Sequence, residues 1–184
     1  QVEVNREIDK TSKSNAFVSP THTDLIGRKL KPGVVRAVAR RKRAIGQQEK
    51  ITLYGDYDVD GITGVSILLS LLTQLRAQVD YYITHRIDEG YGLNDEAIRS
   101  LAETGVDLVI TTDCGISAVA SAGLAAELGL DLIITDHHQF GPELPRAQAI
   151  VHPLRDETYP NPASAGAMVA FKLAWARGNS GPNW

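Results

Sequence analysis

Three carboxylates stand at alternate positions in the stretch Tyr54–Gly61, which reads Y-G-D-Y-D-V-D-G. They are Asp56, Asp58 and Asp60, and they come directly after the apolar run Ile51–Tyr54. Carboxylates this close repel one another unless a cation or a basic group lies between them, and hard divalent cations prefer carboxylate oxygens. The stretch therefore predicts a metal site. The alternative is an acidic turn after a strand, because Asp and Gly also favour turns.

Two further apolar runs end in residues of the same kind. Asp113 follows the run 107–112, and Asp136, His137 and His138 follow the run 130–135. Because the carboxyl ends of parallel strands share the edge of a sheet where ligands bind, we expect the three groups to meet. Singly, Asp113 could cap a helix and the histidines could be hydrogen-bonded loop residues. Their convergence at one edge favours a functional site.

The combined set of ligands indicates which metal and which chemistry to expect. Carboxylates with imidazole suit Mn²⁺ or Mg²⁺ better than a structural zinc, which prefers Cys and His. The set is large enough for two ions, and two ions about 3.5–4 Å apart stabilise the attacking and leaving oxygens of a phosphoryl displacement. The residues alone predict a metal-dependent phosphoester hydrolase.

The pattern of apolar residues predicts the elements that must position these side chains. Strands are expected at 51–54, 79–84, 107–112, 130–135 and 147–151. Helices are expected at 33–45, 61–75, 94–104, 117–128 and 165–177, with Asn94 as an N-cap. The predicted fold class is α/β: a Rossmann-like, doubly wound, mainly parallel five-stranded sheet with helices on both faces.

The first expected helix carries a run of basic residues, namely Arg36, Arg40, Arg41, Lys42 and Arg43. Such a cluster can hold phosphates, but runs of charge are common on solvated helix faces, and we favour a solvated face here. The net charge of the chain is −3, so any binding of nucleic acid must be local.

The composition narrows the class of protein. The chain has 184 residues, of which 43% are hydrophobic and 22% are charged, as in an ordinary globular domain. It has no stretch long and apolar enough to cross a bilayer and no signal-peptide pattern, so we expect no membrane partner. The single cysteine, Cys114, excludes an internal disulfide and indicates a cytoplasmic location.

Several motifs follow one another along residues 51–174. They are Y-G-D-Y-D-V-D-G-I-T-G at 54–64, R-I-D-E-G-Y-G-L at 86–93, D-C-G at 113–115, D-H-H at 136–138, L-P-R-A-Q-A-I-V-H-P at 144–153 and S-A-G-A-M-V-A-F-K-L at 164–173. In this order they resemble the DHH phosphoesterase superfamily, and most closely its RecJ-like exonucleases. The resemblance implies 5′-to-3′ hydrolysis of single-stranded DNA to mononucleotides, in DNA repair and recombination.

The resemblance also implies a role for each predicted site residue. Asp58 and Asp60 would each bind one of two ions, Mn²⁺ or Mg²⁺. Asp113 would bridge both ions and His137 would bind the second, while Asp56 would be a further ligand or an acid that orients one. A water or hydroxide shared by the ions would attack phosphorus.

Two further site residues would act beside the ions. His138 would face the scissile phosphate and help to neutralise its charge. Asp136 would orient the two histidines, as carboxylates behind metal ligands do.

The stretch 86–93 would contact the DNA. The Arg86 guanidinium can pair with phosphate and the Tyr91 ring can stack on a base. Gly90 and Gly92 would let the backbone approach the strand closely. The alternative is a turn closed by glycines.

The sequence also departs from the family pattern. Tyr54 stands where some members have a histidine, so one possible ligand is absent, and Asp56 could compensate. His85 and His152 replace other residues of the pattern, and we interpret both as surface or loop residues rather than ligands.

We expect three segments: an arm and basic helix at 1–46, a C-terminally truncated DHH catalytic domain at 47–178, and a tail at 179–184. The family's fourth motif, with a further metal-binding aspartate, and its DHH-associated domain would lie beyond these residues. We therefore expect the 184 residues alone to have an incomplete second metal site and little processive activity.

Two other functions remain open. One is a phosphodiesterase acting on oligoribonucleotides or cyclic dinucleotides, and the other is a non-catalytic RecJ-like scaffold. Besides single-stranded DNA, a single-strand-binding protein or a helicase is a candidate partner.

Overall fold

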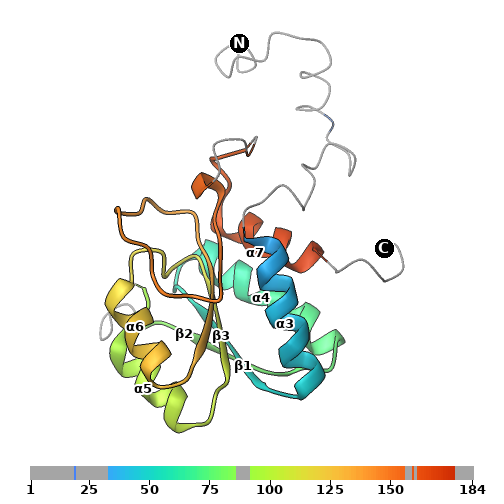
Figure 1. Ribbon diagram of the computed structural model, residues 1–184. Helices are drawn as coiled ribbons and strands as arrows, with labels where there is room; N and C mark the ends of the chain where they lie inside the picture. Colours follow the sequence, from blue (N-terminus) through green and yellow to red (C-terminus); the bar gives the residue numbers. More distant parts are fainter. Residues whose placement is uncertain (1–18, 20–32, 86–91, 156–158, 160, 177–184) are drawn as a thin grey trace.

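The computed structural model describes residue 19 and residues 33–85, 92–155, 159 and 161–176. Its strands form one sheet with helices on both faces (Figure 1). The strands are β1 (Lys50–Gly55), β2 (Gln78–Ile83), β3 (Leu108–Thr112), β4 (Asp131–Thr135) and β5 (Ala149–Val151). The helices are α3 (Val34–Gln47), α4 (Val59–Gln74), α5 (Asp95–Glu103), α6 (Val119–Glu127), α7 (Gly166–Trp175) and the short 3-10 helix η3 (Pro153–Arg155). Within these residues, no helix is both long and apolar enough to span a membrane.

The sheet has the strand order β2-β1-β3-β4-β5, and every neighbouring pair is parallel. The predicted doubly wound α/β sheet with helices on both faces is confirmed. From β1 the chain passes to β2 on one side and then returns to β3 on the other. The order of strands therefore reverses between β1 and β3, and in open α/β sheets the crevice at the carboxyl ends of such strands is where ligands bind.

Each face of the sheet has its own apolar core, because successive side chains of a strand point to opposite faces. On one face, α3, α4 and α7 cover Leu53, Ile110 and Ile133 (Figure 1). On the other face, α5 and α6 cover Val109 and Leu132. Strand β3 is buried along its whole length, as a parallel strand covered on both sides must be.

The boundaries of the elements differ from the predicted ones by at most two residues. Asn94 caps α5 as predicted, since its side chain accepts a hydrogen bond from the Ala97 N–H at 2.8 Å. Helix α4 begins at Val59, earlier than expected, because the Asp58 side chain accepts from the Gly61 N–H at 2.9 Å and caps the first turn.

The solvated face predicted for the basic helix is wrong for two of its arginines. Arg40 and Arg41 of α3 are buried, at 7% and 2% exposure. Arg41 donates to the backbone carbonyls of Leu173 and Ala176, at 2.9 and 3.2 Å, and so joins α3 to α7. Arg40 pairs with Glu49, which follows the helix, and with Asp131 at the start of β4, and a local pattern of charge does not reveal that these acids meet it.

Candidate metal centre

The register of the sheet brings the predicted site residues to one edge. Gly55 pairs with Thr112, and Thr112 pairs with Thr135. The next residues along each strand are Asp56, Asp113 and Asp136, so the three acids stand in a row across the carboxyl ends of β1, β3 and β4. Asp56 and Asp113 continue the strand pairing by donating N–H bonds to the carbonyls of Thr112 and Thr135, at 3.4 and 2.9 Å. The row flanks the point where the strand order reverses.

Three side chains at this edge form a group that could hold a metal ion. Asp113, His137 and His138 each offer a donor atom, and these atoms lie within 4.8 Å of one another. The His137 Nε2 lies 3.0 Å from Asp113 Oδ1 and 3.9 Å from Asp60 Oδ2. The alternative in which Asp113 caps a helix is wrong, because α6 begins after Ala118 without a side-chain cap.

The surroundings of Asp113 favour a cation. Burial, then the hydrogen bond and charge of Asp58, then the charges of Asp60 and Asp136, raise the pKa of Asp113 to about 8. A cation among these carboxylates would relieve their repulsion. The carboxyl group fits against α7 because residue 166 is a glycine. A Cβ on Gly166 would lie 2.2 Å from Asp113 Oδ1.

The donor set agrees with the metals expected from the sequence. Burial, followed by the charges of nearby acids, raises the pKa of the Cys114 thiol well above its usual value, so the thiol stays protonated. Carboxylate oxygens and imidazole nitrogens remain as donors, and these suit Mn²⁺ or Mg²⁺. The residues present therefore fit a divalent cation.

Asp58 and Asp60 are held by the first turns of two helices. Asp58 caps α4, and although burial acts to raise the pKa of its carboxyl, the hydrogen bonds from Gly61 and with Asp113 hold that pKa below its usual value. Asp60 accepts from the N–H groups of Gly166 and Ala167 at the start of α7, at 3.0 and 3.3 Å. Helix N-termini favour negative charge, so both carboxylates are fixed beside Asp113.

Asp136 is occupied in holding the two histidines. Its Oδ1 accepts the N–H groups of His137 and His138, at 2.7 and 3.1 Å, and lies 2.8 Å from the His138 Nδ1. Its Oδ2 accepts the Ile116 N–H at 2.9 Å. These contacts fix the backbone of His137 and His138 and the ring of His138.

Residues 50–183 match the model of one protein family, the DHH family, N-terminal domain. The chain belongs to the DHH family. The relationship that the motifs indicated is thereby confirmed, and the D-H-H triplet at 136–138 lies at the sheet edge described above.

Similar proteins include exonucleases of this family. The chain is 51% identical over 174 residues to the single-stranded-DNA-specific exonuclease RecJ of Bacillus subtilis, a match that covers 94% of this chain and 22% of that protein. It is 38% identical over 146 residues to RecJ of Escherichia coli, covering 78% of this chain and 25% of that protein. The chain thus spans about a quarter of the length of these relatives.

Two solved structures share the DHH fold described here. A crystal structure of exonuclease RecJ bound to manganese matches with a TM-score of 0.74 and 39% identity, covering 79% of this chain and 37% of that one. RecJ in complex with Mn²⁺ from Thermus thermophilus matches with a TM-score of 0.67 and 34% identity, covering 78% of this chain and 20% of that one.

Asp56 lies within the row but faces a different partner. It is 2% exposed, and its Oδ1 accepts a hydrogen bond from the Thr84 hydroxyl at 3.1 Å. Among the described residues, the group of close donor atoms consists of Asp113, His137 and His138. Asp56 is placed to support the edge of β1 beside that group.

The predicted DNA-contacting residues Arg86, Gly90 and Tyr91 lie outside the described residues. Gly92 is described, is buried and has φ +86°, which favours the turn alternative for this glycine. Its carbonyl accepts a hydrogen bond from the Tyr54 hydroxyl at 3.0 Å. Tyr54, which replaces a possible ligand, therefore anchors the chain that follows the stretch 86–91.

Two residues near the site have features that were not predicted from the sequence. The interpretation of His152 as a loop residue rather than a ligand agrees with its place between β5 and η3, but a surface position is wrong, because the residue is fully buried and its Nε2 lies 2.8 Å from the His138 carbonyl oxygen. Exposed His85 agrees with that interpretation. The role of Gly166 was missed, although its place in the motif S-A-G-A-M was the available signal.

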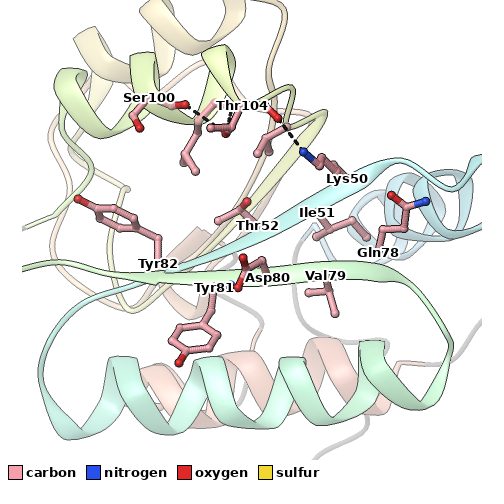
Figure 2. A pocket seen from close by; sticks show the side chains of 12 residues that line it. Lys50, Ile51, Thr52, Gln78, Val79, Asp80, Tyr81, Tyr82, Ser100 and Thr104 are labelled. Carbon is pink, nitrogen blue, oxygen red and sulfur yellow. Dashed lines mark hydrogen bonds between the residues drawn. The ribbon is translucent and has the colours of Figure 1, made fainter.

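A hollow of about 500 Å³ lies elsewhere in the described structure, beside β1, β2 and α5 (Figure 2). Lys50 and Gln78, the first residues of their strands, line it together with Tyr82 and Thr104. The metal group stands beyond the opposite ends of the strands. None of the site residues that the structure describes lines this hollow, so it is separate from the candidate metal centre.

Proposed function

We propose that this DHH-family chain carries the metal centre of a phosphodiesterase that hydrolyses single-stranded DNA from the 5′ end. The observation that carries the proposal is the convergence of Asp113, His137 and His138 beside Asp58 and Asp60. A buried carboxyl with a pKa of about 8 among other acids is poised to exchange its proton for a cation.

In this proposal Asp58, Asp60, Asp113 and His137 would hold two ions, and Asp56 would support the centre as a further ligand or through its neighbours. Bound Mn²⁺ or Mg²⁺ would supply Lewis acidity and an activated water. His138 binds the scissile phosphate, and Asp136 holds the ring that does so through the contact at 2.8 Å.

The substrate is inferred from relatives whose names specify single-stranded DNA. Because this chain spans about a quarter of their length, the 5′-to-3′ direction and the release of mononucleotides are part of the proposal. So are contacts of Arg86 and Tyr91 with DNA, a single-strand-binding protein or helicase as partner, and a cytoplasmic location.

Two measurements test the proposal. Calorimetric titration should show Mn²⁺ binding to the chain, and binding should be lost in Asp113→Asn. A single-stranded DNA oligonucleotide should then release mononucleotides from its 5′ end in an Mn²⁺-dependent manner, at a low rate, while the matched duplex should resist.

The same assay separates the alternatives. Faster turnover of an oligoribonucleotide or a cyclic dinucleotide than of DNA would favour the second phosphodiesterase. Absence of Mn²⁺ binding by the wild-type chain, or binding unchanged in Asp113→Asn, would favour the scaffold and contradict the proposed function.

A further inference from the structure

His152 extends the row of residues at the carboxyl edge of the sheet. Val151 of β5 pairs with Thr135 of β4, so His152 comes level with Asp136. The Asp136 N–H bonds to the Val151 carbonyl at 3.3 Å and continues the pairing to the end of both strands. The short strand β5 thus delivers a fully buried imidazole to the edge that carries the metal group.

The two ring nitrogens of His152 have defined roles. The Leu154 N–H donates to Nδ1 at 3.1 Å, so Nδ1 is the unprotonated acceptor. The proton therefore lies on Nε2, which is 2.8 Å from the His138 carbonyl oxygen and donates to it. The ring also packs edge-on against Phe140, with 5.0 Å between ring centroids. Burial and these contacts fix one tautomer in one orientation.

The dipeptide His137–His138 is consequently held from two sides. Asp136 accepts both of its N–H groups and contacts the His138 ring. His152 holds the carbonyl at the far end of the same dipeptide. A rotation of this backbone that carried the two imidazoles away from Asp113 would break these hydrogen bonds.

We propose that His152 is a positioning residue of the metal centre, which holds the His138 carbonyl through its Nε2–H and thereby keeps His137 and His138 in place for Asp113 and the cations. This inference rests on the proposed function, since it assigns His152 a part in metal binding. His152 itself touches neither substrate nor metal in this role.

Two substitutions of His152 each keep one of its two hydrogen bonds and remove the other. In His152→Gln the side-chain amide can place a donor near the position of Nε2, so the bond to the His138 carbonyl is kept and the acceptor for Leu154 is lost. In His152→Asn the amide oxygen can replace Nδ1 as acceptor, and the bond to the carbonyl is lost. Thermal unfolding of both variants shows whether they fold alike.

The first measurement needs no metal. Long-range proton–nitrogen NMR correlations of the wild-type chain should show His152 protonated on Nε2. The Gln139 amide belongs to the same peptide group as the His138 carbonyl, so its resonance should shift strongly in His152→Asn and little in His152→Gln. A proton on Nδ1, or a Gln139 amide unchanged in His152→Asn, would overturn the inference.

The second measurement is the Mn²⁺ affinity of the same proteins. Loss of a group that orients metal ligands weakens binding by about 10–100-fold, so we expect at least about 10-fold weaker binding for His152→Asn and rescue to within about threefold for His152→Gln. Equal losses in the two variants, or no loss in either, would overturn the positioning role. If the wild-type chain binds no Mn²⁺, the proposed function fails, and the Gln139 resonance still decides whether the hydrogen bond exists.

Discussion

Strand β4 has acids near both of its ends, and the negative charges of the two groups are balanced to different extents. At its first residue, Asp131 accepts from Arg40 Nε at 2.5 Å, from Arg43 Nη2 at 3.0 Å and from Gln148 Nε2 at 2.7 Å. Arg40 also pairs with Glu49. The negative charges of these acids are therefore paired with arginines of α3.

Beyond the other end of β4 the acids lie next to one another. Asp113 is surrounded by the charges of Asp58, Asp60 and Asp136, and its contacts include the rings of His137 and His138. Burial, and after it these neighbouring acids, raise the pKa of Asp113. The comparison shows that the acids at one end are paired with arginines, whereas those at the other end gain most from a cation. Substitutions at the two ends should therefore act differently.

The largest effect on metal binding is expected from Asp113→Asn. The substitution removes the carboxylate at the centre of the metal group, and Mn²⁺ affinity should fall by about 100-fold or more, beyond the loss typical of an orienting residue. Isothermal titration calorimetry measures this change. Unfolding of the metal-free variant at pH 8 should meanwhile require more denaturant than for the wild type, because a repelling charge is gone.

The matching change at the other end is Arg40→Met. It leaves the carboxylates of Glu49 and Asp131 without a buried cation, and removing one partner of a buried ion pair costs about 3–5 kcal/mol. Because the Asp131 side chain is 24% exposed and keeps Arg43, we expect the free energy of unfolding to fall by about 2–3 kcal/mol. Mn²⁺ affinity of the folded variant should stay within about twofold, since additivity holds for distant sites; a larger change would break the distinction between the two ends.

Gly166→Ala tests how closely α7 approaches the metal group. Its new Cβ would lie 2.2 Å from Asp113 Oδ1 and 2.9 Å from Asp113 Cβ, so the acid must move. We expect Mn²⁺ binding to weaken about 10-fold, as for other disturbed ligands. Gly64→Ala is the control, because its Cβ would crowd Thr112 and Ala170 at 3.1 and 3.3 Å without touching the carboxyl. Equal Mn²⁺ affinities of the two variants would contradict the prediction.

The pH dependence of stability should also distinguish the two ends. Folded metal-free protein keeps a proton on Asp113 up to about pH 8, whereas the unfolded chain releases it near the usual value of about 4. The unfolding free energy should therefore fall as pH rises between these values, by roughly 1 kcal/mol per pH unit from this group. The lowered pKa of Asp58 acts oppositely, because its stabilisation is lost as pH falls below about 4.

Denaturant titrations across this pH range isolate the contribution of Asp113. The difference in stability between wild type and Asp113→Asn should grow with pH, and it should shrink or reverse when Mn²⁺ binds the wild type, because a ligand of the folded state stabilises it. A constant difference would show that Asp113 ionises normally.

Local patterns in the sequence were enough to predict much of the fold and part of the site. Apolar runs marked the five strands of the described residues, and the acids that follow three of them predicted the edge where Asp113 and His137 meet. The buried ion pairs of Arg40 could not be predicted, because Glu49 and Asp131 reach it only through folding. The burial of His152 could not be predicted from its residue type, because it depends on the register between β4 and β5.

The smallest effect is expected from Gly46→Ala, at the arginine-rich end of the molecule. Gly46 lies in the last turns of α3, and a Cβ there would meet nothing within 4 Å. Alanine should therefore raise the free energy of unfolding by about 0.5–1 kcal/mol through backbone entropy alone. Denaturant titration measures the gain, and Mn²⁺ affinity should not change. If stabilising α3 in this way altered Mn²⁺ binding, the arginine-paired end would be coupled to the metal centre, and the two ends of β4 could no longer be treated as independent.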